Sequence, residues 1–157
     1  MVRPITLAAV LVAGLLAVLA PGCGAGQPPR ATTLEEATQH FYDALNKVLE
    51  GDVEPMLALW SHADDVTYMS PFGELLVGWA PIRDSWQQQA DSHLGGRVEP
   101  EDLHYFASRT LGVVVGFERG TIVLDGKETA VNIRATSTYR LEDGRWMMIG
   151  HHTDPIG

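Results

Sequence analysis

The sequence predicts an α+β domain in which three N-terminal helices pack against one face of a curved antiparallel sheet. Apolar residues recur at helical spacing early in the chain, and strand-forming segments joined by Asp-Gly turns fill its last third. A third observation is length, because the 135 residues that follow the first 22 match the commonest size of a single domain. Helices laid across the concave side of such a sheet can leave a conical cavity.

The N-terminus predicts export. Arg3 is followed by a nearly unbroken apolar run at 5–20, and small residues precede Cys23. This layout is typical of a bacterial signal peptide over residues 1–22. We expect a lipoprotein whose lipid is attached to Cys23. Simple secretion and an uncleaved anchor are the alternatives, and each of the three places the domain outside the cytoplasm.

The composition of the remaining chain limits the kinds of partner that the domain can bind. Residues 23–32 are small, polar and Pro-rich, which indicates a flexible tether, and the domain occupies residues 33–157. Cys23 is the single cysteine, so the domain has no internal disulfide. Twenty acidic residues stand against 11 Lys and Arg, without a basic cluster. This balance argues against nucleic acid as a partner and leaves the lipid anchor as the expected membrane contact.

Helical spacing identifies three segments. The first, 33–51, opens with a capping box formed by Thr33 and Glu36 and closes at a glycine. The second, 52–60, is shorter and begins with a capping aspartate. The third runs from about 81 to 95. Their apolar positions are Leu34, Ala37, Phe41, Leu45 and Val48 in the first, Met56, Leu57, Leu59 and Trp60 in the second, and Ile82, Trp86 and Ala90 in the third.

Strand signals occupy the rest of the domain. Val66–Ser70 and Leu75–Val77 form a short hairpin before the third helix. The later strands are Leu103–Ser108, Leu111–Arg119, Thr129–Leu141 and Arg145–Thr153. Asp125-Gly126 and Asp143-Gly144 are strong two-residue hairpin turns, so we expect these strands to form an antiparallel meander.

The last hairpin fixes which side chains share a face. A two-residue turn at Asp143-Gly144 pairs Glu142 with Arg145, and side chains alternate from there. One face, apolar near the turn and polar beyond it, suits a pocket wall. It carries Ile133, Ala135, Ser137, Tyr139, Leu141, Trp146, Met148, Gly150, His152 and Asp154. A three-residue turn would instead bring Arg140 against Trp146.

The opposite face of this hairpin mixes polar and apolar side chains. It carries Arg134, Thr136, Thr138, Arg140, Met147, Ile149 and His151. Such a face suits a subunit interface better than a core, so we expect a homodimer through the sheet.

His152 and Asp154 are the candidate catalytic residues. They lie on one face at roughly 7 Å, which allows a general base with a partner carboxylate. The alternatives are two ligands of a metal site, or a partly buried histidine bonded to a neighbour near the chain end. His151 and His152 point to opposite faces and cannot share a metal. Since no third ligand, phosphate loop or nucleophile elbow is present, no metal or cofactor is expected.

Five further residues are candidates for contact with a ligand. They are Trp60, Tyr68, Ser70, Phe72 and Trp86. Tyr68 and Ser70 alternate with Val66 toward the expected cavity. An aromatic-lined pocket fits an apolar ligand, whereas the same rings packed together would be ordinary core.

Several segments together resemble the nuclear transport factor 2-like superfamily, and more closely its SnoaL-like and DUF4440 branch, which includes relatives of ketosteroid isomerase. They are Phe41–Asn46, Gly51-Asp52, Leu59–Thr67, Ser70–Gly73, Gly78-Trp79, Tyr139-Arg140, Asp143–Trp146 and His151–Asp154. The resemblance covers about residues 34–154. It implies a cone-shaped NTF2-like fold with an apolar pocket, a homodimer through the sheet, and a position for His152 near the pocket.

The resemblance also implies a difference between this chain and the ketosteroid isomerases in the catalytic base. Ketosteroid isomerases carry an aspartate base immediately before the proline of the first hairpin, where this chain has Ser70. A serine hydroxyl cannot shuttle a proton near neutral pH as a carboxylate does. The tyrosine of their oxyanion hole falls near Phe41 or Tyr42.

Two functions follow from these observations. The first is an exported domain that binds a small, largely apolar molecule, with isomerase-, cyclase- or hydrolase-like acid-base chemistry from His152 and Asp154. The second is a non-catalytic interaction or oligomerisation module whose cavity is filled core. A roomy pocket favours the first function, and Trp60, Phe72 and Trp86 collapsed together favour the second.

Overall fold

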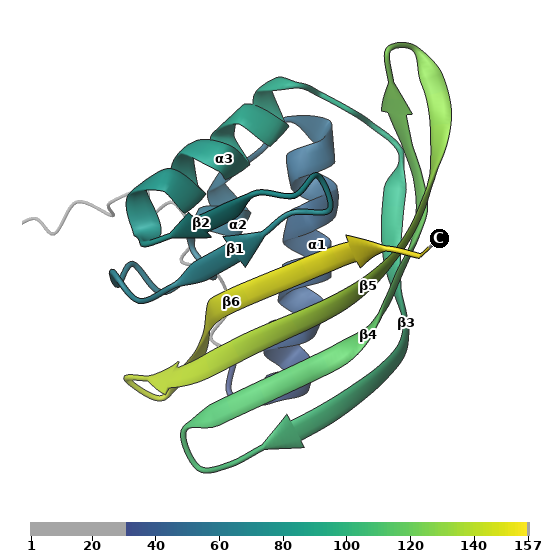
Figure 1. Ribbon diagram of the computed structural model, residues 1–157. Helices are drawn as coiled ribbons and strands as arrows, with labels where there is room; N and C mark the ends of the chain where they lie inside the picture. The colour runs from purple at the N-terminus through teal and green to yellow at the C-terminus, as the bar shows by residue number, and fades with distance from the viewer. Residues whose placement is uncertain (1–30, 157) are drawn as a thin grey trace, which may run out of the picture.

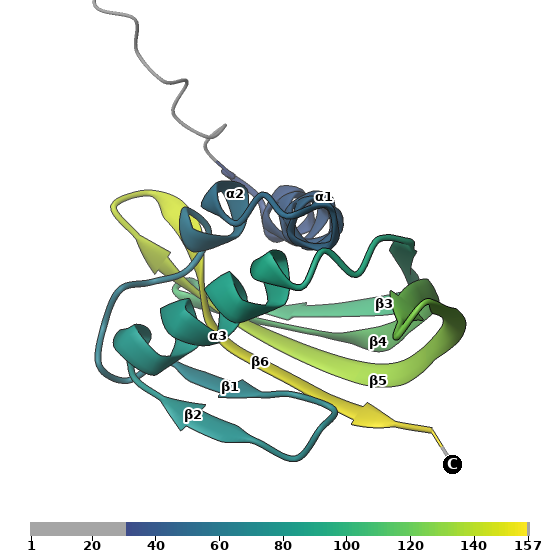
Figure 2. The same cartoon turned by 90° about the horizontal axis from the view of Figure 1, so that it is seen from above.

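The computed structural model describes residues 31–156, in which helices cover one face of a curved sheet that does not close (Figures 1 and 2). The expected signal peptide and Cys23 lie outside the described residues. Six strands follow the order β2-β1-β6-β5-β4-β3. Helices α1 and α3 lie on the concave side of the sheet, as the view from above shows (Figure 2). Within the described residues, no helix is both long and apolar enough to cross a membrane.

Helix α1, Leu34–Glu50, begins and ends where the sequence predicts. The Thr33 hydroxyl accepts a hydrogen bond from the Glu36 amide at 3.1 Å, and the Glu36 carboxylate accepts one from the Thr33 amide. Gly51 closes the helix at φ +100°, a left-handed conformation that glycine adopts without strain. The buried side of α1 includes Phe41 and Tyr42, which face the sheet.

The second helix is shorter than predicted. Helix α2 spans only Glu54–Leu57, and the prediction that it reaches Trp60 is wrong. The backbone leaves the helix because residues 59–61 bond to β6: the Met148 amide donates to the Leu59 carbonyl at 2.9 Å, and the Ser61 amide donates to the Met148 carbonyl at 2.9 Å. Tertiary pairing therefore overrides the local helical pattern.

The first hairpin and the third helix follow the sequence closely. Strands β1, Thr67–Met69, and β2, Leu75–Val77, pair antiparallel. Helix α3, Trp79–Asp91, starts two residues before the expected position because proline is tolerated in a first turn. It buries Ile82, Trp86 and Ala90, the predicted apolar side.

Four long strands complete the sheet. They are β3 (Arg97–Ala107), β4 (Leu111–Leu124), β5 (Lys127–Glu142) and β6 (Arg145–Pro155). In both predicted Asp-Gly turns the two residues have φ between +48° and +74°, which confirms two-residue hairpins of the type that needs φ above zero at both positions. The pairing is not wholly antiparallel, since β1 lies parallel to β6.

The register of the last hairpin changes partway along. Pairing is as predicted from Glu142–Arg145 to Tyr139–Met148, and then shifts because Ile149 has no partner in β5. Such a β-bulge turns every later side chain of one strand to the other face. Ser137 therefore pairs with His151, not with Gly150, and the predicted shared face is wrong beyond Met148.

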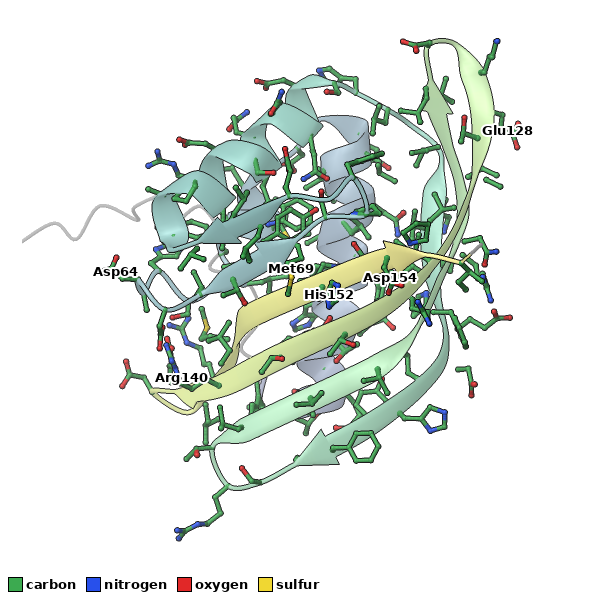
Figure 3. All side chains as sticks on the ribbon, in the orientation of Figure 1. Asp64, Met69, Glu128, Arg140, His152 and Asp154 are labelled. Carbon is green, nitrogen blue, oxygen red and sulfur yellow. The ribbon has the colours of Figure 1, made fainter. Side chains whose placement is uncertain are left out.

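The bulge exchanges the two histidines. His151 is buried against the helices, while His152 lies exposed on the outer face beside Met69 (Figure 3). Of the side chains expected on the outer face, Ile149 instead packs against the core. No helix covers the outer face of the described sheet, and Leu75 and Val77 are 63% and 58% exposed there.

Candidate functional site

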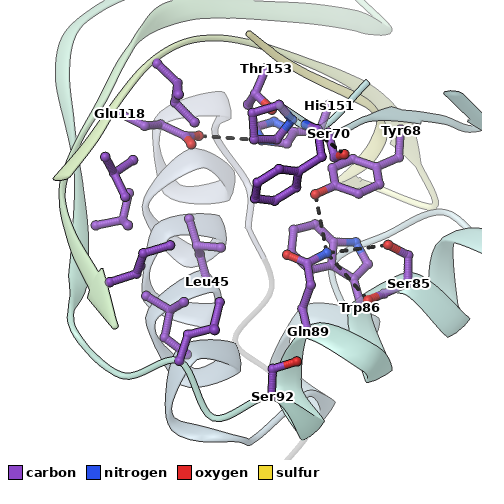
Figure 4. A pocket seen from close by; sticks show the side chains of 18 of the residues that line it. Leu45, Tyr68, Ser70, Ser85, Trp86, Gln89, Ser92, Glu118, His151 and Thr153 are labelled. Carbon is purple, nitrogen blue, oxygen red and sulfur yellow. Dashed lines mark hydrogen bonds and ion pairs between the residues drawn. The ribbon is translucent and has the colours of Figure 1, made fainter. Parts of the chain in front are cut away.

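A cavity of about 450 Å³ opens between α1, α3 and the concave side of the sheet (Figure 4). This volume lies in the range of about 300–1,000 Å³ that is usual for small-molecule sites. One side is apolar and comes from α1, the α3–β3 connection, the start of β3 and the curled parts of β4 and β5: Leu45, Leu49, Leu94, Val98, Ile122, Leu124, Val131 and Ile133. The other side comes from α3 with its C-terminal cap and from the first hairpin, and it combines the apolar Pro71, Phe72 and Trp86 with a larger set of polar residues: Tyr68, Ser70, Glu74, Ser85, Gln88, Gln89 and Ser92.

Two titratable side chains meet in the wall of this cavity. Glu118 comes from β4 and His151 from β6, and β5 lies between these strands. The His151 Nε2 atom lies 3.5 Å from the Glu118 Oε1 atom, and both side chains are buried, at 3% and 4% exposure. The pairing exists because the bulge at Ile149 turns His151 inward.

Burial disfavours the charged form of both members of this pair. Loss of solvation raises the pKa of Glu118 from 4.5 to about 7, and the nearby Tyr42 hydroxyl opposes part of that rise. Burial lowers the pKa of His151 from 6.5 to about 3, with a smaller contribution from the charge of His152. At neutral pH Glu118 therefore exists in both protonation states, and His151 remains an uncharged imidazole.

Residues next to the pair orient it. The Ser137 hydroxyl lies 3.0 Å from His151 Nδ1, and both groups are buried. A hydroxyl can either donate to Nδ1 or accept from it, so Ser137 serves both tautomers of the ring. The Phe41 ring packs against the imidazole with centroids 4.7 Å apart. Glu118 Oε1 itself receives no hydrogen bond within the described residues.

The first hairpin and α3 supply the opposite side. Tyr68 stacks on His151 with ring centroids 6.1 Å apart, and it lies 5.0 Å from the Trp86 ring. The Gln89 side-chain amide donates to the Tyr68 hydroxyl at 3.4 Å (Figure 4). The rings of His151, Tyr68 and Trp86 thus form a row that runs from Glu118 toward α3.

Four of the five expected ligand contacts line the cavity. Tyr68 and Trp86 form its wall, Ser70 lies beside them, and Phe72 is 80% exposed. The placement of Trp60 in the cavity is wrong, because its side chain is fully buried in the core and is absent from the cavity wall. Trp60 itself forms the backbone bridge to Met148, and its ring packs in the core.

His152 and Asp154 do not lie in the cavity. His152 is exposed on the outer face, and Asp154 forms an ion pair with Arg134 there (Figure 3). Their expected placement in a pocket wall is therefore wrong. The physical reason is the single unpaired residue in β6, which the turn chemistry does not reveal.

Sequence reasoning missed Glu118. It lies in β4 at a position that alternates with Val113, Val115 and Phe117, so the local pattern predicts an exposed carboxylate. The apolar residues of β4 in fact divide between both faces, because the outer face is itself partly apolar. The one available signal was that Glu118 shares a face with Val114 and Ile122. Among residues 31–156, no three His, Asp or Glu side chains gather as metal ligands.

Comparison with protein families matches residues 34–154 to the SnoaL-like domain. A provisionally named association domain of calcium/calmodulin-dependent protein kinase type II from Thiobacillus denitrificans is 26% identical, with 82% of this chain and 99% of that chain covered and a TM-score of 0.69. A provisionally named dehydratase of the NTF2-like family from Streptomyces avermitilis is 22% identical, with 77% and 91% covered and a TM-score of 0.69.

A provisionally named ketosteroid isomerase from Shewanella frigidimarina shares 12% identity, with 75% and 91% covered and a TM-score of 0.63. No curated protein matches the chain. These similarities confirm the predicted NTF2-like cone of helices on a curved sheet. The names of the neighbours differ in activity, so the fold alone does not select a function.

Proposed function

The chain belongs to the SnoaL-like domain family, and on that basis we propose that it binds a small, largely apolar molecule in the cavity and transfers a proton to or from it. One observation carries the proposal: a buried carboxyl and a buried imidazole face each other in the wall of a cavity of about 450 Å³. A site for a largely apolar ligand combines an apolar lining with polar groups that orient the ligand, and this cavity has an apolar side and a side rich in polar groups.

The chemistry of the pair suits acid-base catalysis of isomerisation, cyclisation or dehydration. A general acid or base works best when its pKa lies near the working pH, and burial brings Glu118 to about 7. The carboxyl can give its proton to a ligand oxygen or accept one from an activated carbon. His151 stays a neutral imidazole that Ser137 holds through Nδ1, and its Nε2 atom faces the Glu118 carboxyl at 3.5 Å, so the ring positions the carboxyl without carrying a charge.

Substitution of the pair tests this proposal. Glu118→Gln and His151→Gln should each reduce turnover or ligand affinity by at least about tenfold, a typical loss when an acid-base group is removed. His152→Gln is the matched control, because this side chain lies on the outer face and should leave the measurement within about twofold. Equal sensitivity of all three variants, or none in any, would contradict the assignment of the cavity.

A second function is favoured by a different observation. The outer face of the sheet is uncovered within the described residues and carries exposed Leu75 and Val77, which suits assembly with a second copy of the chain. The neighbour from Thiobacillus denitrificans is named as an association domain, which supports an oligomerisation module. A homodimer through the sheet is compatible with ligand binding, since the cavity opens on the opposite face.

We further propose that the protein is exported and anchored through Cys23. The support is the sequence alone: Arg3, the apolar run and the small residues before Cys23. Cells that express the chain with labelled palmitate should yield a labelled protein, and Cys23→Ser should remove the label. Label that persists in Cys23→Ser would contradict the anchor, and secreted unlabelled protein would favour simple secretion.

A further inference from the structure

The cavity wall carries acidic side chains but no cationic ones. Its titratable residues are Glu74, Glu118, Tyr68 and His151, and it contains neither Lys nor Arg. Burial prevents His151 from becoming a cation near neutral pH, and it also keeps Tyr68 protonated by raising its pKa. The two carboxyl groups therefore have no positive partner within the cavity.

Two arginines of β4 and β5 are engaged by other carboxylates outside the cavity. Arg119, the sequence neighbour of Glu118, points to the outer face and bonds to Glu101 at 2.8 Å. Arg134 pairs with Asp154, also outside the cavity. Glu118 is the carboxyl that stays buried without a cation, and its Oε1 atom accepts no hydrogen bond in the described structure.

From these observations we propose that the cavity selects an organic cation, a largely apolar molecule whose protonated amino group pairs with Glu118. This inference rests on the proposed function and names the ligand class of the same site. A neutral ligand would be served equally well by a glutamine at this position, which donates a hydrogen bond without the cost of burying an acid. In binding affinity, as distinct from proton transfer, a cation alone gains from the carboxylate.

Three further points support a cation at Glu118. An alkyl ammonium group has a pKa of about 10 in water, above that of Glu118 even after burial, so the proton stays on the amine. The rings of Tyr68 and Trp86 line the path to Glu118, and aromatic faces attract cations. Glu74, near the exposed Phe72, adds a second negative charge to the wall.

The protonation state of Glu118 controls binding of the cation, because the titratable groups that face Glu118 do not change charge near neutral pH. They are Tyr42 from α1, Tyr68 from β1, Tyr139 from β5 and His151 from β6. Burial raises the pKa of each tyrosine and lowers that of His151, so Glu118 is the one group of this set that ionises between pH 6 and 8. The cation binds the ionised form and displaces the proton of Glu118.

Three probes of one shape and different charge test the inference. They are 1-(2-naphthyl)ethylamine, 2-acetylnaphthalene and 2-naphthoate, titrated into the purified protein by calorimetry or by NMR of its amide signals. At pH 8 the amine should bind at least tenfold more tightly than the ketone, and 2-naphthoate should bind least. The amine affinity should rise about tenfold from pH 6 to pH 8, as the ionised fraction of Glu118 does for a pKa of about 7.

Glu118→Gln supplies the variant, since an amide of equal size keeps the cavity filled. It should remove both the preference for the amine and its pH dependence while the ketone still binds. Glu74→Gln is the matched control and should weaken the amine only about twofold, because this carboxylate is exposed and screened.

The outcomes separate the two proposals. If the ketone or the carboxylate binds most tightly, or if Glu118→Gln leaves the amine affinity unchanged, the cation inference is wrong and the cavity remains a ligand site. If none of the three probes binds to the wild-type protein, the proposed ligand-binding function fails together with the inference.

Discussion

Glu118 shows how burial of one residue couples stability to pH. Because burial raises its pKa from 4.5 to about 7, the folded chain holds this proton more tightly than the unfolded chain does. The stabilisation is complete below pH 4.5 and is lost as the pH rises through 7. The pKa shift of His151 has the opposite effect on stability. Burial lowers this pKa to about 3, so the stabilisation is present above pH 6.5 and is lost as the pH falls through 3.

Glu118→Gln should therefore be more stable than the wild type at high pH. The shift of the Glu118 pKa corresponds to about 3 kcal/mol, which the wild type loses between pH 4.5 and 8 and the variant keeps. Urea unfolding at pH 4, 6 and 8 measures the difference, which should vanish near pH 4. Glu128→Gln, an exposed change at the β4–β5 turn, serves as the control (Figure 3). A variant less stable than wild type at pH 8 would indicate an ion pair with His151.

At the scale of elements, close backbone contacts allow the sheet to curl over the helices. Gly96 precedes β3 at φ +82°, and a Cβ atom there would lie 2.0 Å from the Thr121 carbonyl oxygen of β4. Real Cβ atoms do not approach an oxygen this closely, so the backbones of the two strands must separate if any side chain is present. Residues from this curled region form the apolar wall of the cavity.

Gly96→Ala should destabilise the fold far more than Gly73→Ala. Both positions have positive φ, at +82° and +94°, but Gly73 has no atom within 4 Å of the added carbon. The left-handed conformation alone costs about 1–2 kcal/mol, which is the loss expected for Gly73→Ala. The Gly96 variant should lose about 3 kcal/mol or more because backbone displacement adds to that cost. Thermal melts compare the two, and similar melting temperatures would contradict the close approach.

At the scale of the whole molecule, the sheet has two unlike faces. The concave face carries the helices and the cavity, whereas no helix covers the other face in the described chain (Figure 2). One row across this outer face joins Leu75, Met69, His152, Thr136 and Val115 from neighbouring strands. Such a mixed surface suits the proposed homodimer.

Val115→Asp should convert that homodimer to monomer, because it places an unpaired charge in the centre of the buried surface. Val123→Asp makes the same chemical change near the end of β4, where the side chain is 40% exposed, and should leave the dimer intact. Light scattering after size exclusion at micromolar protein gives the mass. A wild-type monomer, or equal dissociation of both variants, would contradict an interface centred on the outer face.

The sequence by itself determined the elements that depend on local chemistry. The capping box at Thr33, the closing Gly51 and the two Asp-Gly turns act within a few residues, so helix α1 and both hairpin turns could be predicted. The order of these elements also predicted the α+β class, whereas the parallel pairing of β1 with β6 was not predicted.

Only the tertiary structure decided which side chains form the site. Met148 bonds to residues 59–61, the next part of β6 pairs with β1, and Ile149 is left over between these partners. That one extra residue brings His151 in and turns His152 out, although the two are adjacent in the chain. The burial of Glu118 was likewise undecided by β4 alone, because a strand does not specify which of two partly apolar faces the helices will cover.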